Sequence, residues 1–139
     1  MAQKLKITLG GETYLADLLW QEAPRTCEAF IAACPFESRI FSAKICDAEV
    51  TYPVPGKIAD LDLMENPKFE EPAGAVVWYG AWSSICIFFD ICEPYGTCNM
   101  FARICEADRE RFAAACRAVW DDQGALIRNE IVDVEDEEA

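Results

Sequence analysis

The stretch TYLADLLWQEAPRTCEAFIAAC, from Thr13 to Cys34, decides the fold. In its first part, apolar residues recur at Tyr14, Ala16 and Leu18. This period of two is typical of a strand with one buried face. Two glycines, Gly10 and Gly11, lie just upstream of the stretch and follow the alternating segment LKITL, which indicates a hairpin. The chain is therefore expected to open with two paired strands.

The second part of the stretch predicts a helix that begins at Pro24. Proline suits a first helical turn, because its missing N–H would have no partner there. Apolar residues follow at helical spacing, and Pro35 ends the helix. The expected buried face consists of Cys27, Phe30, Ile31 and Cys34.

Later segments repeat these two kinds of pattern. Further strands are predicted at 38–46, 49–54, 76–79, 84–89, 99–104 and 125–132. In the strand at 99–104, Met100, Ala102 and Ile104 are expected to share one face. A second helix is predicted over 106–120, with Trp120 on its apolar face. Between the strands, 56–72 is expected to be a loop with one short helical turn at 61–64.

Many short strands and two helices predict one architecture. It is mainly β: a closed, mostly antiparallel barrel whose open ends are capped by the two helices.

Two regions resemble cyclophilins. Pro24, Thr26 and Phe30 match the P-x-T-x-x-N-F start of the first cyclophilin helix. The order strand, acidic turn, helix and closing strand over 96–132 resembles the cyclophilin C-terminal end. The chain resembles more closely an uncharacterised bacterial family, a domain of unknown function with a cyclophilin-like barrel. The matching segments are APRTCEAF, ENPKFEEPAG and FFDICEPYG. The resemblance implies a closed cyclophilin-like β-barrel.

The same resemblance argues against prolyl isomerase activity. Active cyclophilins carry F-H-R-x-x-x-x-F-M-x-Q-G, and the corresponding segment here reads ESRIFSAKICDAEV. Arg39 can occupy the place of the arginine, but the M-x-Q-G, the substrate-binding histidine and the tryptophan loop are not recognisable. Function belongs to the site and not to the fold.

Composition bounds the remaining possibilities. With 139 residues and 53% hydrophobic residues, we expect one barrel domain over 1–133 and a solvated acidic tail over 134–139. No long apolar run or charged-then-apolar leader is present, so a soluble, cytoplasmic protein is expected. A net charge of −13 argues against nucleic acid or an anionic membrane as a partner.

Eight cysteines are present without any C-x-x-C pair, and the chain contains no histidine. We therefore expect reduced structural thiols and neither a metal site nor a cofactor. Three cysteines, Cys46, Cys92 and Cys98, are kept open as reactive thiols. The absence of histidine also excludes Ser-His and Cys-His nucleophile pairs and imidazole acid–base catalysis.

The remaining polar and aromatic residues predict a small pocket on the barrel face. The candidate ligand-binding residues are Lys44, Cys46, Glu49, Glu65, Asn66, Tyr79, Trp82, Glu93, Tyr95 and Asn99. Glu49 either faces inward, where burial would let a carboxyl transfer protons, or lies on the other side of the pleat. Lys44 either activates the thiol of Cys46 or is simply exposed. Asn66 either lines the pocket or bonds to its own backbone in a turn.

Two hypotheses of function follow. The first is a small-molecule binding protein, with conversion of the ligand left open. The alternative is a non-catalytic barrel that assembles with itself or a partner through exposed apolar surface. Either is compatible with a homo-oligomer, with a dimer expected first.

Overall fold

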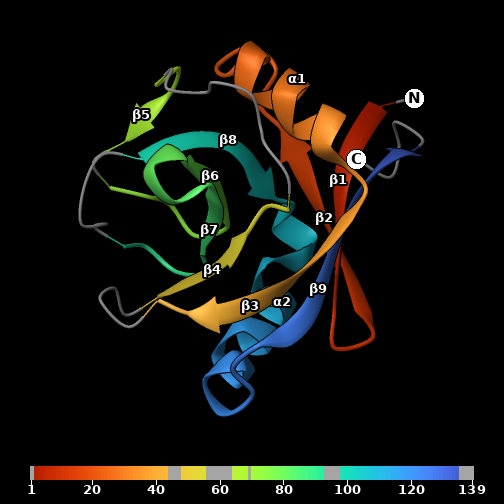
Figure 1. Ribbon diagram of the computed structural model, residues 1–139, viewed down its shortest axis with the longest axis vertical. Helices are drawn as coiled ribbons and strands as arrows, with labels where there is room; N and C mark the ends of the chain where they lie inside the picture. The colour runs from red at the N-terminus through yellow and green to blue at the C-terminus, as the bar shows by residue number, and fades with distance from the viewer. Residues whose placement is uncertain (1, 44–47, 56–63, 69, 93–97, 135–139) are drawn as a thin grey trace.

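The computed structural model describes residues 2–43, 48–55, 64–68, 70–92 and 98–134, and shows a closed barrel with two helices (Figure 1). The helices are α1 (Pro24–Ala33) and α2 (Glu106–Ala118), with 3-10 turns η1 (Gly80–Trp82) and η2 (Val119–Asp121). The strands are β1 (Ala2–Leu9), β2 (Glu12–Leu18), β3 (Phe36–Ser42), β4 (Glu49–Pro53), β5 (Pro67–Lys68), β6 (Ala75–Tyr79), β7 (Ser84–Phe88), β8 (Cys98–Ile104) and β9 (Ala125–Val134).

The strands pair in the order β2-β1-β9-β3-β4-β7-β6-β8-β5, and an additional pairing of β2 with β8 closes the barrel. All of these pairings are antiparallel. The short β5 pairs only with the start of β8, outside the closed ring. The predicted mainly-β barrel with two helices is therefore confirmed.

The opening stretch forms as its pattern predicts. Gly10 and Gly11 have φ angles of 62° and 80°, which glycine adopts without steric cost, and they turn β1 into β2. Tyr14, Ala16 and Leu18 are all buried. In α1 the buried residues are Thr26, Cys27 and Phe30, whereas Ile31 and Cys34, expected on the same face, are only partly buried. The helix therefore packs a narrow stripe of side chains against the barrel.

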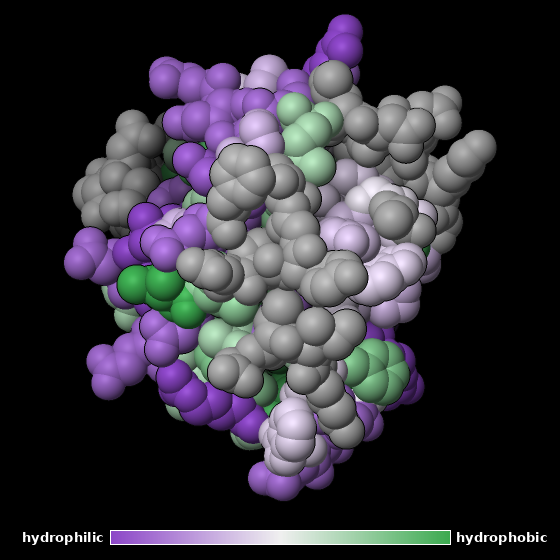
Figure 2. Space-filling model, turned by 90° about the vertical axis from the view of Figure 1, so that its left-hand side faces the viewer, coloured by the Kyte–Doolittle hydropathy of each residue, from purple (hydrophilic) through white to green (hydrophobic). Residues whose placement is uncertain are grey.

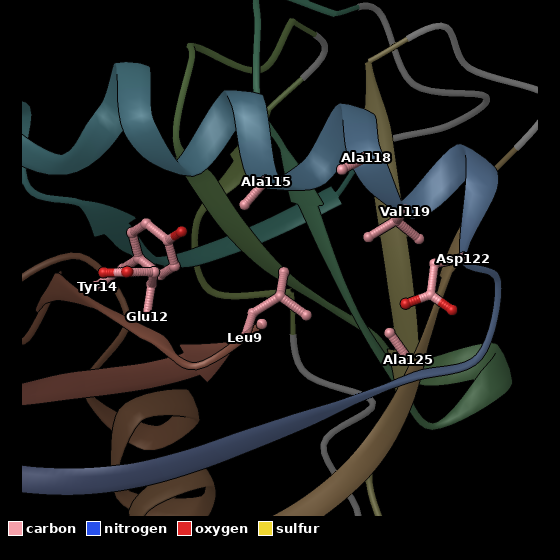
Figure 3. A pocket seen from close by; sticks show the side chains of 9 residues that line it. Leu9, Glu12, Tyr14, Ala115, Ala118, Val119, Asp122 and Ala125 are labelled. Atoms are coloured by element: carbon pink, nitrogen blue, oxygen red, sulfur yellow. The ribbon is translucent and has the colours of Figure 1, made fainter.

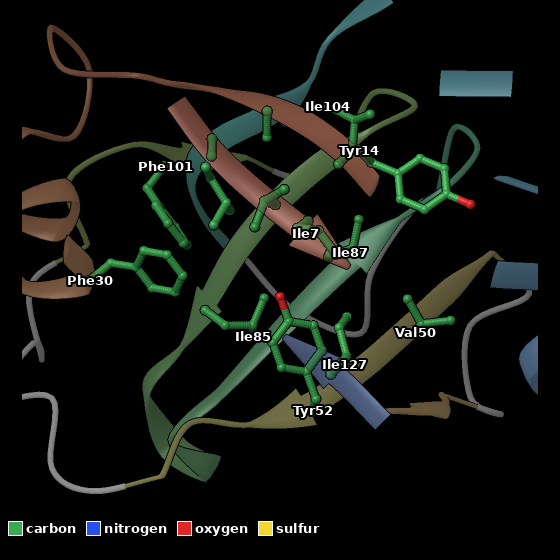
Figure 4. Packing of buried hydrophobic residues seen from close by; sticks show 14 of the residues in the cluster. Ile7, Tyr14, Phe30, Val50, Tyr52, Ile85, Ile87, Phe101, Ile104 and Ile127 are labelled. Atoms are coloured by element: carbon green, nitrogen blue, oxygen red, sulfur yellow. The ribbon is translucent and has the colours of Figure 1, made fainter. Parts of the chain in front are cut away.

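The barrel interior is filled by aromatic and branched aliphatic side chains from all sides (Figure 4). Phe30 reaches from α1 to Phe101 on β8, with ring centroids 4.9 Å apart. At the centre, the fully buried Tyr52 hydroxyl donates a hydrogen bond to Asn129 Oδ1 at 2.8 Å. The central polar pair thus fixes β4 relative to β9 within an otherwise apolar core.

Strands β6, β7 and β8 are buried on both faces, which explains their continuous apolar sequence. One face contributes to the barrel interior. The other forms a second group, here called the outer-face cluster, made of Ala75, Val77, Cys86, Phe88, Cys98 and Met100. Leu19, Tyr79 and Cys92 pack against it. This cluster lies on the outside of the sheet and is covered by other parts of the chain.

Two details of the side-chain pattern were predicted wrongly. A register shift between Val76 and Val77 places a bulge in the pairing of β6 with β8. As a result Phe101 is buried in the barrel interior with Ala102, whereas Met100 belongs to the outer-face cluster. Trp120 is 59% exposed, because α2 ends at Ala118 and the chain continues as a 3-10 turn.

Several expectations lie partly outside the described residues. These are the end of the strand predicted at 38–46, the helical turn at 61–64 and the acidic tail beyond Val134. The seven described cysteines are free thiols. Burial raises the pKa of Cys27 and of Cys34 to about 12. Neither described helix is long and apolar enough to cross a membrane.

Candidate functional site

The structure brings three predicted site residues together. Glu65, Asn66 and Asn99 form a hydrogen-bonded group with Thr26 of α1, here called the loop network. Lys44, Cys46, Glu93 and Tyr95 lie outside the described residues.

Glu65 closes the N-terminus of α1. Its carboxylate accepts hydrogen bonds from the backbone N–H of Arg25 at 3.2 Å and of Thr26 at 2.6 Å, and from Thr26 Oγ1 at 2.8 Å. Ala23 at the N-cap position has no side chain able to do this. Burial alone would raise the pKa of Glu65, but the hydrogen bonds from Thr26 and Arg25 outweigh burial and lower it. Glu65 therefore serves as a cap supplied from a distant loop.

The rest of the loop network connects this cap to the sheet. Asn99 Nδ2 donates to Thr26 Oγ1 at 3.0 Å, and Asn99 Oδ1 accepts from the backbone N–H of Asn66 at 3.0 Å. Asn66 Nδ2 donates to the carbonyl oxygen of Met100 at 2.9 Å, so its side chain binds β8. Thr26 and Asn99 are only 1% and 2% exposed. The network thus holds 64–68 against α1 and β8.

We expect Thr26→Val to lower the free energy of unfolding by about 2 kcal/mol, because Glu65 and Asn99 each lose a buried partner while the side-chain shape is kept. Thr13→Val, at an exposed position of β2, is the matched control and should change stability by less than about 0.5 kcal/mol. Urea denaturation measures both. Equal effects of the two substitutions would show that the loop network contributes nothing to the free energy of unfolding.

Glu49, Tyr79 and Trp82 do not join this group. Val50 and Tyr52 of β4 are fully buried in the interior, so the half-buried Glu49 lies on the outer side of the pleat. There its carboxylate acts on Cys86: burial raises the pKa of this thiol, and the negative charge of Glu49 adds to the effect. The rings of Tyr79 and Trp82 contact each other at the end of β7 opposite to Glu49, with centroids 4.8 Å apart. Trp82 is 67% exposed.

Sequence reasoning missed Glu71, the most unusual polar residue that the structure describes. Its side chain is fully buried, and neither carboxylate oxygen has a hydrogen-bond partner among the described residues. Its backbone pairs with that of Cys92, with N–H to carbonyl distances of 2.8 and 3.1 Å. Because Cys92 packs on the outer-face cluster, Glu71 is held at the edge of this apolar group.

Burial raises the pKa of Glu71 to about 7, and the positive charge of Lys68 offsets only part of this rise. The carboxyl therefore titrates near neutral pH and can either donate or accept a proton there. In the sequence, Glu71 is one of two adjacent acids in a loop without periodicity, which is typical of a solvated segment. Only its position inside the segment ENPKFEEPAG, which resembles the family, indicated that Glu71 could belong to a functional site.

Figure 2 shows the side of the molecule that carries β4, β5, β6 and β7, where apolar surface lies between polar residues. The described Cys, Asp and Glu side chains include no group of three that could hold a metal ion. A cavity of about 290 Å³ lies elsewhere, between α2 and the β1–β2 hairpin, and none of the predicted site residues lines it.

Comparison with known protein families shows to which family the chain belongs. Residues 5–129 match the family described as protein of unknown function (DUF3830). The chain belongs to this family. The match begins in β1 and ends in β9, so the DUF3830 domain comprises nearly the whole described barrel. No protein of curated function matches it.

Two solved structures share the fold of this DUF3830 domain. McbB, solved in complex with tryptophan, superposes with a TM-score of 0.75 at 18% identity, over 92% of this chain and 44% of McbB. The DUF3830 chain thus spans less than half the length of McbB. The hypothetical protein AF2241 from Archaeoglobus fulgidus, a solution structure, gives a TM-score of 0.63 at 18% identity, over 93% of this chain and 94% of that protein. At this identity the similarity concerns the fold alone.

Proposed function

We propose that this protein binds a small molecule beside the outer-face cluster, and that the carboxyl of Glu71 recognises it. The observation that carries the proposal is the complete burial of both Glu71 oxygens without a hydrogen-bond partner among the described residues. Burying an unpaired carboxyl costs free energy, and proteins keep such groups mainly where function needs them. A ligand that enters beside the outer-face cluster when the residues covering it move apart would supply the missing partner.

The chemistry around Glu71 favours a ligand that carries N–H groups. Glu71 and Glu49 both lie on the outer side of the sheet, and the chain carries a net charge of −13, so an anionic ligand is disfavoured. The thiols and aliphatic groups of the outer-face cluster suit an apolar body. An amine or a nitrogen heterocycle combines both properties. McbB, which shares the fold, was solved with tryptophan, a molecule of this kind.

Besides binding a ligand, such a site can transfer protons to and from it. A carboxyl with a pKa of about 7 is present in both protonation states near neutral pH. It can take a proton from a bound N–H or C–H group and return it to another atom. Conversion of the ligand is therefore the second part of this proposal, and it rests on the same residue.

Thermal-shift titration with tryptophan, tryptamine, indole and indole-3-acetate tests the proposal. We expect tryptamine or indole to raise the melting temperature of the wild type by about 9 °C at ligand concentrations roughly 100-fold above Kd. Glu71→Gln, which keeps the shape and removes the acid, should abolish most of this shift. The adjacent, exposed Glu70 provides the matched control, since Glu70→Gln should leave the shift intact.

Two results would contradict the proposal. If Glu70→Gln and Glu71→Gln reduce the shift equally, binding depends on net charge and not on the buried carboxyl. If indole-3-acetate stabilises the wild type more than tryptamine does, the ligand class is wrong. Glu49→Gln should weaken binding less than Glu71→Gln, because Glu49 is only half-buried.

A further inference from the structure

The cavity of about 290 Å³ lies at one end of the barrel, between α2 and the β1–β2 hairpin (Figure 3). Its size is at the lower end of the range for small-molecule sites. Its lining is separate from Glu71, Cys92 and the outer-face cluster, and consists of Leu9, Gly10, Glu12, Tyr14, Ala115, Ala118, Val119, Asp122 and Ala125. The buried side chains of Leu9 and Val119 make its apolar floor.

Tyr14 lines this cavity and is the aromatic residue of its wall. The residue is only 2% exposed, and its hydroxyl is not among the fully buried polar atoms that lack a partner in the described part of the chain. The ring is held in place by Phe112 at 5.0 Å and by Arg111 at 4.4 Å from its centroid. Burial raises the pKa of Tyr14, so the hydroxyl keeps its proton at neutral pH.

The opposite side of the cavity is negatively charged. Figure 3 shows Asp122 across the cavity from Tyr14. Asp122 forms no ion pair with any described residue, whereas Glu12 pairs with Arg111 at 3.7 Å. Asp122 also follows the C-terminal end of α2 and its 3-10 turn, where the helix dipole favours a cation. The lining includes two carboxylates and neither lysine nor arginine.

We propose that this cavity is a second ligand site, and that it takes a small elongated primary amine with an apolar middle and a hydroxyl group at its far end. The ammonium group pairs with Asp122, the apolar part packs on Leu9 and Val119, and the far hydroxyl bonds to the Tyr14 hydroxyl. This arrangement gives the exposed carboxylate of Asp122 a cationic partner and the hydroxyl of Tyr14 a polar one. The inference is independent of the function proposed for Glu71.

Titration of the full chain by ¹⁵N–¹H NMR tests this site with three matched probes. Tyramine carries both end groups, phenethylamine lacks the hydroxyl, and 4-hydroxyphenylacetate replaces the cation by an anion. We expect saturable shifts of the Ala115, Ala118 and Ala125 amides with tyramine. Phenethylamine should bind more weakly, by about three- to tenfold, through the lost hydrogen bond. The anion should bind at least about tenfold more weakly than tyramine.

Matched variants show which side chains bind tyramine. Asp122→Asn should weaken tyramine binding by about two- to fivefold, and Asp121→Asn, at an equally exposed neighbour outside the lining, by less than about twofold. Tyr14→Phe should weaken tyramine binding and leave phenethylamine unchanged. Ala115→Leu, which fills the cavity, should abolish binding of both amines.

Three outcomes would overturn the proposal: equal effects of Asp121→Asn and Asp122→Asn, equal binding of the amine and the acid, or no saturable shift at about 10 mM, a concentration at which even weak sites of this size fill. The thermal stability of Tyr14→Phe gives a readout independent of ligand. Because no hydrogen bond joins the hydroxyl to another described residue, removing it should not lower the melting temperature. A clear loss of stability would show a structural role and contradict the ligand site.

Discussion

Replacing Glu71 by glutamine is expected to raise the free energy of unfolding at pH 8 by about 3 kcal/mol, and to leave it nearly unchanged near pH 4.5. The folded-state pKa of Glu71 is about 7, whereas the ordinary value is 4.5. Between these two pH values the unfolded chain releases the proton and the folded protein keeps it. The contribution of the Glu71 carboxyl to the free energy of unfolding of the wild type is therefore fully present below pH 4.5 and is lost as the pH rises to about 7.

Urea denaturation at several pH values between 4.5 and 8 measures this difference. The wild-type curve should fall relative to that of Glu71→Gln by about 1.4 kcal/mol per pH unit and then run parallel above pH 7. Glu70→Gln, at an exposed position, should follow the wild type throughout. Parallel curves for wild type and Glu71→Gln over the whole range would contradict the burial of an unpaired carboxyl.

Truncating Phe30 to alanine should lower the free energy of unfolding by about 3–5 kcal/mol. Phe30 is 1% exposed, and its ring lies 4.9 Å from that of Phe101 and 5.8 Å from that of Phe36. Its removal leaves a cavity between α1 and the barrel, and it loosens the helix whose first turn Glu65 caps.

Glu28→Ala, on the exposed side of the same helix, separates packing from helix propensity and should change stability by less than about 0.5 kcal/mol. Chemical denaturation followed by tryptophan fluorescence measures both variants. A loss below about 1 kcal/mol for Phe30→Ala would mean that the core closes around the gap, or that α1 contributes little to the barrel.

The fold could be predicted because its main elements carry local patterns. Alternation at Tyr14, Ala16 and Leu18 and the glycine pair before them depend only on neighbouring residues. The segments that resemble the family predicted in addition that the sheet closes into a barrel. The burial of Phe101 could not be predicted, because a bulge depends on how β8 meets its partner strand, and a single sequence does not contain that register.

The sites were harder to predict than the fold for a related reason. Glu65, Asn66 and Asn99 were identified as candidates, but their joint role depends on Thr26. This residue lies 39 positions from Glu65, which caps α1, and 73 positions from Asn99. Glu71 carries no local sign of burial, since its neighbour Glu70 is exposed and both stand in an irregular loop. Tyr14 reads as an ordinary core residue until the cavity beside it is seen.

The position of β9 has a consequence for how the chain is made. Residues 125–134 pair with β1 on one side and with β3 on the other, so the last strand in the sequence is an inner strand of the sheet. While the ribosome is still translating the segments before it, β1 and β3 each present an unpaired edge, and the barrel cannot close. These open edges can pair with another chain, so the partly folded barrel is exposed to aggregation until β9 joins β1 and β3.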